Sequence, residues 1–238
     1  MIMPSETFWS VSALAQIAHD LRNPLNSISL EIDVLDVLGV FESKLIGASL
    51  ADPSRFDLPR SLGRIRGNLQ FIERLIHDLA EVSMPRQRFS LRRTPCNLRE
   101  LLTNVIDRVI PVWSMARVSF DACQDVVVAV DRLAIERVIA NLLDNALKYT
   151  PTTANIIVRL TCGTSDVDIS VIDEGPGLPQ ADITQVFKPY QRGSTSCGRP
   201  GTGLGLYVAK AIVEAHGGRL GVENMPEHGA RFFVAIPR

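Results

Sequence analysis

The sequence predicts a helical hairpin followed by an α+β two-layer sandwich, in which helices cover one face of a mixed sheet. One observation is an apolar residue at every third or fourth position over residues 5–84, interrupted by a single turn region. The other is the change after Met84 and Pro85, where capped helices alternate with short strands. We therefore expect two domains, residues 1–86 and 87–238, in this chain of 238 residues.

Two apolar seams define the hairpin. Steps of three and four place each seam on one helix face. A lone hairpin buries too little apolar surface, so the seams predict a four-helix bundle formed by a homodimer; the alternative is a hairpin packed against the rest of its own chain. The turn region, residues 39–59, contains Gly39, Gly47, Pro53 and Pro59. The seams consist of Leu14, Ile17, Leu21, Leu25, Ile28, Ile32 and Leu35, and of Leu62, Ile65, Leu69, Ile72, Ile76, Leu79 and Val82.

Cap and turn residues define the elements of the second domain. Asn97 is expected to cap a helix that reaches about Met115, and Asp131 a helix that reaches about Tyr149. A third helix, over residues 202–216, is expected to end at a Gly-Gly pair. Strands are expected at residues 118–120, 126–130, 156–161, 167–172, 220–223 and 231–236.

Charge and hydropathy exclude several classes of protein. Lys and Arg number 25 and Asp and Glu 26, so a net charge of −1 provides no basic surface for bulk binding to nucleic acid or an anionic membrane. No apolar stretch approaches the roughly 18 residues of a membrane span, and the N-terminus does not resemble a signal peptide. We expect a cytoplasmic protein. Its cysteines, at positions 96, 123, 162 and 197, form no zinc or CxxC motif and are expected to be reduced.

The segment NLLDNALKYTP, residues 141–151, places polar groups on one helix face. Asn141 and Asn145 are four residues apart, and Lys148 follows within one further turn. Carboxamide oxygens suit a hard cation, and an ammonium group suits phosphate. The alternative is an ordinary solvated helix face.

Two glycine-rich segments follow. In DEGPGLP, residues 173–179, Asp173 ends a strand, and Gly175 and Gly177 allow a sharp turn close to a ligand; a buried aspartate there can accept a hydrogen bond from an amino group such as that of adenine. In GTGLGL, residues 201–206, the glycines expose backbone N–H groups at a helix N-terminus, which suits phosphate. The spacing is neither that of a Rossmann fingerprint nor that of a P-loop.

The first helix contains HDLRNPLNSI, residues 19–28. His19 and Asn23 lie one turn apart on the same face. Pro24 cannot donate a backbone N–H to the Asp20 carbonyl, so the helix is expected to bend just after His19.

In this order, the segments at 141–151, 173–179 and 201–206 resemble the N, G1 and G2 boxes of the Bergerat-type ATP-binding fold, which sensor histidine kinases share with Hsp90, gyrase B and MutL. VFKPYQRG, residues 186–193, resembles the F box of the kinase lid, although Tyr190 stands where a second Phe is common. HDLRNPLNSI resembles the H box of the dimerisation and histidine-phosphotransfer domain. The paired asparagines resemble the kinase branch, which implies that ATP is kept for transfer rather than hydrolysed.

The resemblance implies roles for individual residues. Asn145 would hold Mg²⁺, with Asn141 assisting directly or through water; Lys148 would contact phosphate, and Tyr149 would lie against the nucleotide. Asp173 would bind the adenine amino group, in a pocket shaped by Gly175 and Gly177. Phe187 and Tyr190 would hold the lid, Arg192 would steady phosphate charge, and Gly201, Thr202, Gly203, Leu204 and Gly205 would close the lid over the triphosphate. His19 would attack the γ-phosphoryl group, and Asp20 would orient the His19 imidazole and accept its proton. Asn23 would orient water for dephosphorylation of a regulator.

The resemblance therefore implies an ATP- and Mg²⁺-dependent histidine autokinase that passes its phosphoryl group to an aspartate of a response-regulator receiver domain. The alternatives are a protein that mainly dephosphorylates its regulator, with nucleotide as a conformational ligand, and a non-catalytic dimeric scaffold. The two domains leave no room for a sensor or membrane domain. We expect either the core of a longer receptor or, with a slight preference, a small kinase whose input comes from a separate sensory protein.

Overall fold

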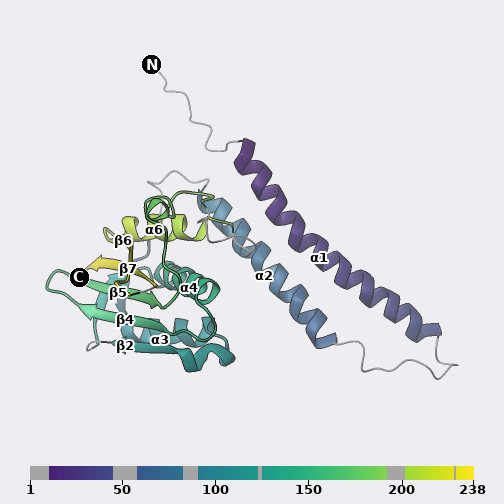
Figure 1. Cartoon of the computed structure of the whole chain (residues 1–238), viewed down its shortest axis with the longest axis horizontal. Coiled ribbons are helices and arrows are strands. Elements are labelled where there is room, and N and C mark those ends of the chain that lie inside the picture. Colours follow the sequence, from purple (N-terminus) through teal and green to yellow (C-terminus); the bar gives the residue numbers. More distant parts are fainter. Residues whose placement is uncertain (1–10, 45–57, 83–90, 123–124, 192–201, 228) are drawn as a thin grey trace, which may run out of the picture. The chain divides into compact units, whose positions relative to one another are not determined.

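The computed structural model describes residues 11–44, 58–82, 91–122, 125–191, 202–227 and 229–238 (Figure 1). The chain divides into two compact units, residues 1–83 and 84–238, here called the hairpin unit and the sheet unit. Each is described by itself. Within the described residues, no helix is both long enough and apolar enough to span a membrane.

The hairpin unit consists of α1 (Val11–Lys44) and α2 (Leu58–Val82). Helix α1 runs through Pro24 and continues past Gly39, so the prediction of a turn that begins at residue 39 was wrong. A single glycine costs a helix only about 1 kcal/mol, and the first proline after it is Pro53. Polar contacts join the two helices, because Asn68 Nδ2 donates to Ser27 Oγ at 3.0 Å and Arg64 pairs with Glu31 at 2.6 Å.

The apolar seams of the hairpin are left partly uncovered. Five residues of the predicted seams keep 45% to 56% of their surface exposed. The side chains that are buried in the hairpin unit include Glu31, Ser61 and Leu75, none of which belongs to those seams. Polar contacts thus join the two helices of one chain, while much of the apolar seam surface remains exposed to solvent in that chain. The five exposed seam residues are Leu25, Ile32, Leu62, Leu69 and Ile76.

The sheet unit contains a five-stranded mixed sheet in the order β2-β4-β5-β7-β6. Strands β2 and β4 are parallel, and the other neighbours are antiparallel. A separate antiparallel pair joins β1 to β3. The strands are β1 (Thr94–Asn97), β2 (Val118–Ala122), β3 (Val127–Val130), β4 (Ile156–Cys162), β5 (Asp166–Asp173), β6 (Arg219–Asn224) and β7 (Ala230–Pro237).

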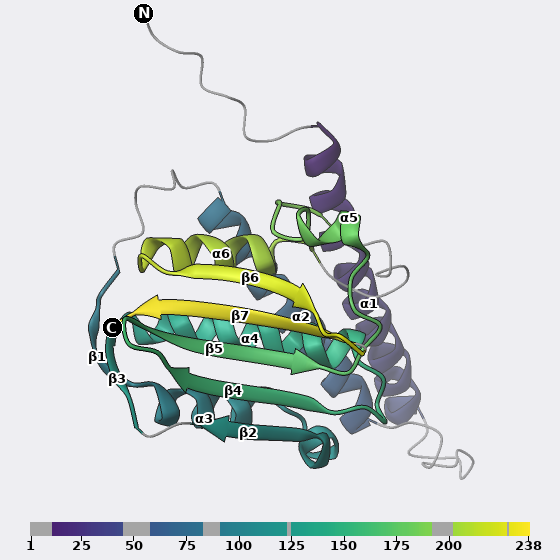
Figure 2. The ribbon, with the colours of Figure 1, turned by 60° about the vertical axis from the view of Figure 1, so that its left-hand side comes forward.

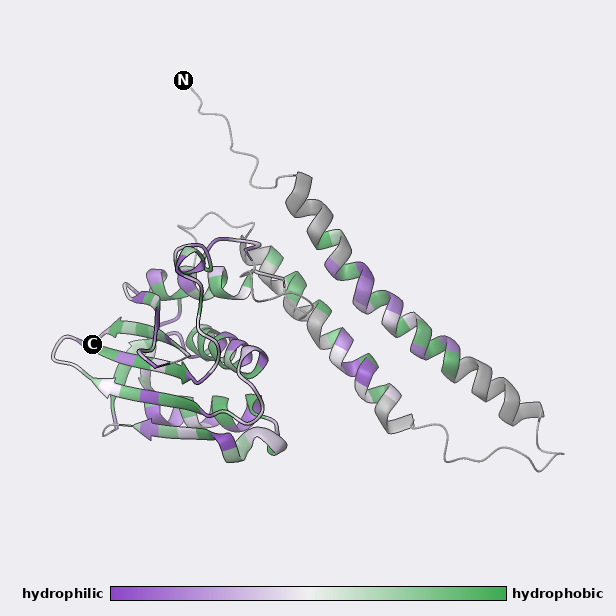
Figure 3. Ribbon diagram, in the orientation of Figure 1, coloured by the Kyte–Doolittle hydropathy of each residue, from purple (hydrophilic) through white to green (hydrophobic). Residues whose placement is uncertain are grey.

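Helices cover one face of this sheet (Figure 2). They are α3 (Leu98–Val109), α4 (Arg132–Tyr149) and α6 (Gly205–Ala215), with the short α5 (Gln180–Ile183) before α6. Alternate strand residues such as Val158, Ile169 and Val234 are fully buried, and hydropathy alternates along the strands (Figure 3). The prediction of a helical hairpin followed by an α+β two-layer sandwich is confirmed.

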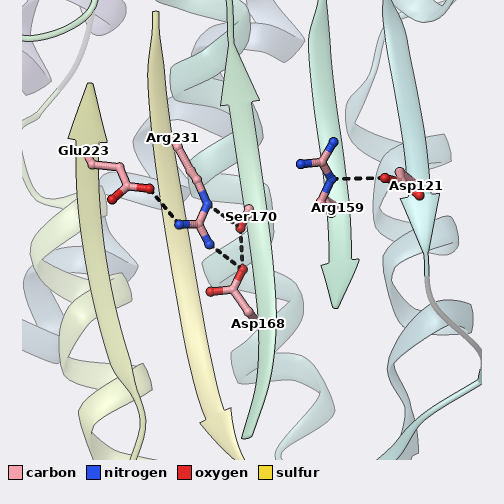
Figure 4. A network of polar contacts seen from close by, with 6 residues as sticks. All are labelled: Asp121, Arg159, Asp168, Ser170, Glu223 and Arg231. Carbon is pink, nitrogen blue, oxygen red and sulfur yellow. Dashed lines mark hydrogen bonds and ion pairs between the residues drawn. The ribbon is translucent and has the colours of Figure 1, made fainter. Parts of the chain in front are cut away.

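The opposite face of the sheet carries charged side chains (Figure 4). Arg231 on β7 donates to Asp168 at 2.8 Å, to Glu223 at 2.7 Å and to Ser170 at 3.0 Å, which joins β5, β7 and β6. Arg159 on β4 donates to Asp121 on β2 at 3.0 Å. Paired charges of this kind keep one sheet face polar while the other packs on the helices.

In the sheet unit, the end of one helix, the start of another and the state of one cysteine differ from the predictions. Helix α3 ends at Val109 because Pro111 cannot continue it, and a 3₁₀ helix over Val112–Arg117 follows in place of the expected extension to Met115. Helix α6 begins at Gly205 rather than residue 202. Cys162 is disulfide-bonded, contrary to the prediction of reduced thiols, while Cys96 is a buried free thiol. Sequence spacing does not show which cysteines the strands bring together.

Candidate functional site

Helix α4 places four candidate residues beside the buried core. Its N-terminus is capped by Asp131, whose Oδ1 accepts from Ala134 N at 3.2 Å. One face is buried through residues such as Ile139 and Leu142. Asn141, Asn145, Lys148 and Tyr149 lie on the remaining surface and are all half-buried. The amphipathic pattern of the helix thus directs these four side chains away from the core.

Asn141 connects α4 to the start of α6. Its Nδ2 donates to the carbonyl oxygen of Gly205 at 3.0 Å, and a Cβ added at Gly205 would lie 3.5 Å from the Asn141 amide. Because Nδ2 is the donor in this bond, Oδ1 is the acceptor atom of the side chain. The structure therefore brings residues of the 141–151 and 201–206 segments into contact.

Lys148 forms an ion pair within α4. Its Nζ lies 2.6 Å from Asp144 Oδ2, one helical turn earlier. A phosphate at Lys148 would share the ammonium group with that carboxylate or replace it. Tyr149, the last residue of the helix, is half-buried.

Asp173 ends β5 in a buried position, with 6% of its surface exposed. Its Oδ1 accepts a hydrogen bond from Gly175 N at 2.8 Å. Burial raises the pKa of this carboxyl above its ordinary value, and the backbone N–H groups of Gly175 and Ala230 partly oppose the shift. Thr150 contributes a polar neighbour in the same direction, although its hydroxyl does not meet hydrogen-bond geometry. A buried carboxylate of this kind is suited to accept a hydrogen bond from a ligand's amino group.

Gly175 and Gly177 are required by the path of the chain after β5. A Cβ at Gly175 would lie 2.6 Å from Asp173 Oδ1. Gly177 has a φ of +70°, and a Cβ there would lie 2.9 Å from Asn224 Oδ1. Side chains at these positions would displace the loop from Asp173.

The residues on either side of segment 192–201 contact each other. Tyr190 N donates to Gly203 O at 3.0 Å, and both residues have positive φ, 61° and 69°. Burial, with a smaller contribution from Tyr207, raises the pKa of Tyr190 to about 12, so its hydroxyl stays neutral at physiological pH. Lys210 on α6 lies 5.6 Å from the centre of the Phe187 ring.

The remaining residues of the 201–206 segment form the entry to α6. Leu204 N donates to Thr202 Oγ1 at 3.2 Å, and Leu204 is fully buried. Arg192 and Gly201 lie outside the described residues.

His19, Asp20 and Asn23 all belong to α1 of the hairpin unit. Asp20 is half-buried and Asn23 is exposed. The His19 backbone is helical, and its side chain lies outside the described part of the structure. Asn23 follows His19 by four residues and therefore shares its helix face.

Amide oxygens are the ligand atoms that this site offers to a cation. Within the described residues no three His, Cys, Asp or Glu side chains gather in a way that would hold a metal. Asn141 and Asn145 instead lie half-buried on α4, and Asn141 contacts the start of α6. Neutral oxygens are compatible with Mg²⁺, which binds few protein ligands when substrate phosphates and water complete its shell.

Two family models match the chain. The His Kinase A (phospho-acceptor) domain matches residues 12–88, and the histidine kinase-, DNA gyrase B- and HSP90-like ATPase matches residues 130–238. The catalytic domain of histidine kinase ThkA, in a nucleotide-free form, is similar with a TM-score of 0.55 and 30% sequence identity, over 61% of this chain and 95% of that one. The chain belongs to the histidine kinase family.

Curated relatives of this histidine kinase are longer proteins. Adaptive-response sensory kinase SasA of Synechocystis sp. (strain ATCC 27184 / PCC 6803 / Kazusa) is 32% identical over 232 residues, which cover 94% of the kinase chain and 58% of SasA. Sensor protein KdpD of Escherichia coli (strain K12) is 31% identical over 229 residues, 94% of the kinase chain and 24% of KdpD. The kinase chain thus spans 58% or less of these two relatives.

A second ThkA structure, in complex with response regulator protein TrrA, is also similar, and the match covers 95% of the histidine kinase chain and 61% of the chain in that structure. Its TM-score is 0.67 and its sequence identity 27%.

Sequence reasoning missed several polar residues in the sheet unit of this histidine kinase. Asn155 and Asn224 hydrogen-bond to the loop after Asp173, and His216 links α6 to the first residues of α4. Each stands next to a strand or helix end, where polar side chains commonly satisfy backbone groups. That position was the signal available in the sequence, but the identity of each partner depends on tertiary structure.

Proposed function

We propose that this histidine kinase uses ATP and Mg²⁺ to phosphorylate its own His19 and then passes the phosphoryl group to an aspartate of a response regulator. The observation that carries the proposal is that α4 of the sheet unit lies against both glycine-containing loops, since a Cβ at Gly175 would lie 3.5 Å from Tyr149 O. There a buried Asp173 lies beside a glycine loop, and Asn141 of α4 contacts Gly205 at the start of α6. The family of the chain supports the use of ATP.

In this proposal the nucleotide base lies at Asp173, whose carboxylate accepts a hydrogen bond from the adenine amino group. Gly175 and Gly177 keep the loop close to the base, and Tyr149 lies against it. Lys148 and Arg192 bind phosphate. The backbone from Gly201 to Gly205 provides N–H donors at the N-terminus of α6, where anions are favoured.

Asn145, with Asn141, would hold Mg²⁺. When bound, the ion would neutralise charge on the triphosphate. The protein's own contribution is to hold the two half-buried amides four residues apart on α4. Asn141 is suited to this because its Nδ2 is already committed to Gly205 O, which sets the direction of Oδ1.

The transfer step is a displacement at the γ-phosphorus. An unprotonated imidazole nitrogen of His19 forms the new N–P bond while the bond from the γ-phosphorus to the bridging oxygen breaks, and the electron pair leaves with ADP. The proton on the other imidazole nitrogen goes to Asp20. Such a transfer depends mainly on positioning and charge neutralisation.

The exposed seam of the hairpin supports a homodimer. Leu25, Ile32, Leu62, Leu69 and Ile76 keep about half of their surface exposed in one chain, since the hairpin's internal contacts are partly polar. A second copy can cover these side chains in a four-helix bundle, as the heptad-like spacing favours. We further propose a functional division at about residue 86 and a cytoplasmic location.

A receiver domain is the proposed acceptor of the phosphoryl group. The complex of the similar kinase ThkA with response regulator protein TrrA supports a regulator as partner. A net phosphatase of the regulator is the second candidate, and it is favoured by the exposure of Asn23 one turn after His19. An amide there can orient water toward a phosphoaspartate.

Incubation of the full chain with radiolabelled ATP and Mg²⁺ tests the proposal. We expect acid-labile, base-stable label on the wild type and none on His19→Gln. Absence of label from the wild type would contradict an autokinase. For the second candidate, a phosphorylated regulator should lose phosphate faster with the wild-type chain than with Asn23→Ala.

A further inference from the structure

The loop after Asp173, residues 174–178, is held from both sides by side chains that the proposed chemistry does not use. This loop includes Gly175, whose N–H donates to Asp173 Oδ1 at 2.8 Å. Any movement of the loop therefore changes the hydrogen bond that fixes the carboxylate. Because two of the five loop residues are glycines, which adopt many backbone conformations, contacts at the two ends of the loop restrict its geometry.

The first bracket, as we call it, joins Glu174 to Asn155. Asn155 donates twice to Glu174 Oε2, from its backbone N at 2.9 Å and from Nδ2 at 3.1 Å. Glu174 N donates to Asn155 O at 3.2 Å. Hydrogen bonds to a carboxylate are stronger than those between neutral groups. The first bracket ties the start of the loop to the segment that follows α4.

The second bracket joins Asn224, the last residue of β6, to Leu178. Leu178 N donates to Asn224 Oδ1 at 2.8 Å, and Asn224 Nδ2 donates to Leu178 O at 2.7 Å. One amide therefore satisfies both backbone groups of Leu178. It fixes the end of the loop on the edge strand of the sheet.

Close packing between the brackets leaves the loop little space to move. Gly177 approaches the second bracket closely, because an added Cβ would lie 2.9 Å from Asn224 Oδ1 and 3.1 Å from Gly229 O. Gly229 in turn lies so close to the Asp173 carbonyl oxygen that a Cβ would be 1.8 Å from it. The brackets and these glycines together fix the loop before any ligand arrives.

We propose that Asn155, Glu174 and Asn224 are positioning residues that preorganise the nucleotide-base pocket and so set its preference for adenine. The inference rests on the proposed function, in which Asp173 accepts from the adenine amino group. These residues act through Gly175 and Asp173 and do not touch the base. Preorganisation raises affinity because the loop loses less conformational freedom on binding.

The test compares ADP with inosine diphosphate on the full chain, by titration calorimetry. Hypoxanthine carries a carbonyl oxygen where adenine carries the amino group, so it cannot donate to a carboxylate. We expect the wild type to prefer ADP by about tenfold or more, as for a hydrogen bond to a charged group. In Asn224→Ala and Glu174→Ala, the Kd for ADP should rise by about tenfold and the preference should fall by about threefold or more.

Two variants separate this role from general destabilisation. Glu174→Gln keeps an acceptor for Asn155. Its Kd for ADP and its preference for ADP over inosine diphosphate should both stay within about twofold of the wild type. Asn97→Ala removes an amide that also makes two hydrogen bonds to backbone, at Arg99 N and Glu100 N, but at the start of α3. It should lower stability without changing the preference for ADP.

The outcomes distinguish the bracket proposal from the function on which it rests. If Asn224→Ala and Glu174→Ala remain folded and keep the wild-type preference, the brackets do not position the pocket, and the role of Asp173 stands. If Asn224→Ala does not fold, the comparison of Glu174→Ala with Glu174→Gln decides. If the wild type fails to bind ADP, or does not distinguish it from inosine diphosphate, the proposed base site is wrong and the bracket proposal falls with it.

Discussion

The carboxylate of Asp173 shows how much of a site can be predicted at the scale of single residues. Its position at a strand end before two glycines was readable from DEGPG. Its burial, which raises the pKa, was not, because burial results from tertiary packing. Ala230 of β7 and Thr150 after α4, which partly oppose the shift, also lie far from Asp173 in sequence. A motif formed by neighbouring residues can therefore be predicted from the sequence, whereas the burial and the pKa of its carboxylate cannot.

The raised pKa of Asp173 predicts an acid limit to nucleotide binding. Burial raises the pKa above the ordinary 3.8, so on acidification the carboxyl takes up a proton at a higher pH than an exposed aspartate does. A protonated carboxyl accepts poorly from an adenine amino group, so ADP affinity should fall as pH drops through the raised pKa. Titration calorimetry of the wild type and Asp173→Asn from pH 7 downward checks this. Asp173→Asn should bind weakly with little of this acid dependence, and equal profiles would contradict the role of Asp173.

Gly175→Ala should weaken nucleotide binding by about tenfold or more, because a Cβ would lie 2.6 Å from Asp173 Oδ1 and displace the carboxylate or the loop. Gly63→Ala is the matched control. Its Cβ has no neighbour within 4 Å, so the same substitution on α2 should leave ADP affinity unchanged. Unchanged affinity in Gly175→Ala would show that the loop does not contribute to the pocket.

At the scale of elements, helices with both a cap and a periodic apolar face were predicted well. Helix α4 ends at Tyr149 as expected, with Asp131 as its cap, because both signals are local. Strand β1 was missed, since its pairing with β3 depends on long-range contacts and Pro95 interrupts the pattern. His216 illustrates a further tertiary contribution: its Nε2 accepts from Asp131 N at 3.0 Å and its Nδ1 donates to Ile212 O at 2.8 Å.

His216 should make the sheet unit less stable in mild acid. Burial, with a smaller effect of Arg93, lowers the pKa of His216 below its ordinary 6.5, despite opposition from Ile212 O and Asp131. Between the two pKa values the unfolded chain binds more protons than the folded one, so the free energy of unfolding falls as pH drops below 6.5.

Urea unfolding at pH 7.5 and pH 5.5 checks this prediction through the tyrosine near-ultraviolet signal. Tyr149, Tyr190 and Tyr207 are the tyrosines of the chain, and all lie in the sheet unit. The wild type should lose more of its free energy of unfolding than His216→Gln between the two pH values. An equal loss in the two proteins would show that His216 does not titrate differently on folding.

At the scale of the whole molecule, the sequence predicted both architectures but not which hairpin contacts are internal. The apolar spacing identified the seams, whereas the structure joins the two helices partly through Ser27, Asn68, Glu31 and Arg64. The exposed seam is consistent with a homodimer, since apolar surface of this extent is stabilised by a partner.

Leu69→Asp should weaken the dimer, because it places a charge on a seam residue that is 49% exposed in one chain. Leu133→Asp is the control, since Leu133 is 77% exposed on α4 of the sheet unit. Sedimentation velocity at several concentrations should give a dimer for the wild type and Leu133→Asp and a shift toward monomer for Leu69→Asp. A wild-type monomer, or no change in Leu69→Asp, would count against the bundle.

We propose that the nucleotide site of the sheet unit serves a histidine in the hairpin unit. The most direct measurement is the position of the phosphoryl group after the full chain is incubated with ATP and Mg²⁺, mapped by mass spectrometry of peptides kept at neutral pH. We predict phosphate on His19 in the wild type and none in Asn145→Ala or Asp173→Asn. Phosphate on another residue, or undiminished phosphate on His19 in both variants, would contradict the account.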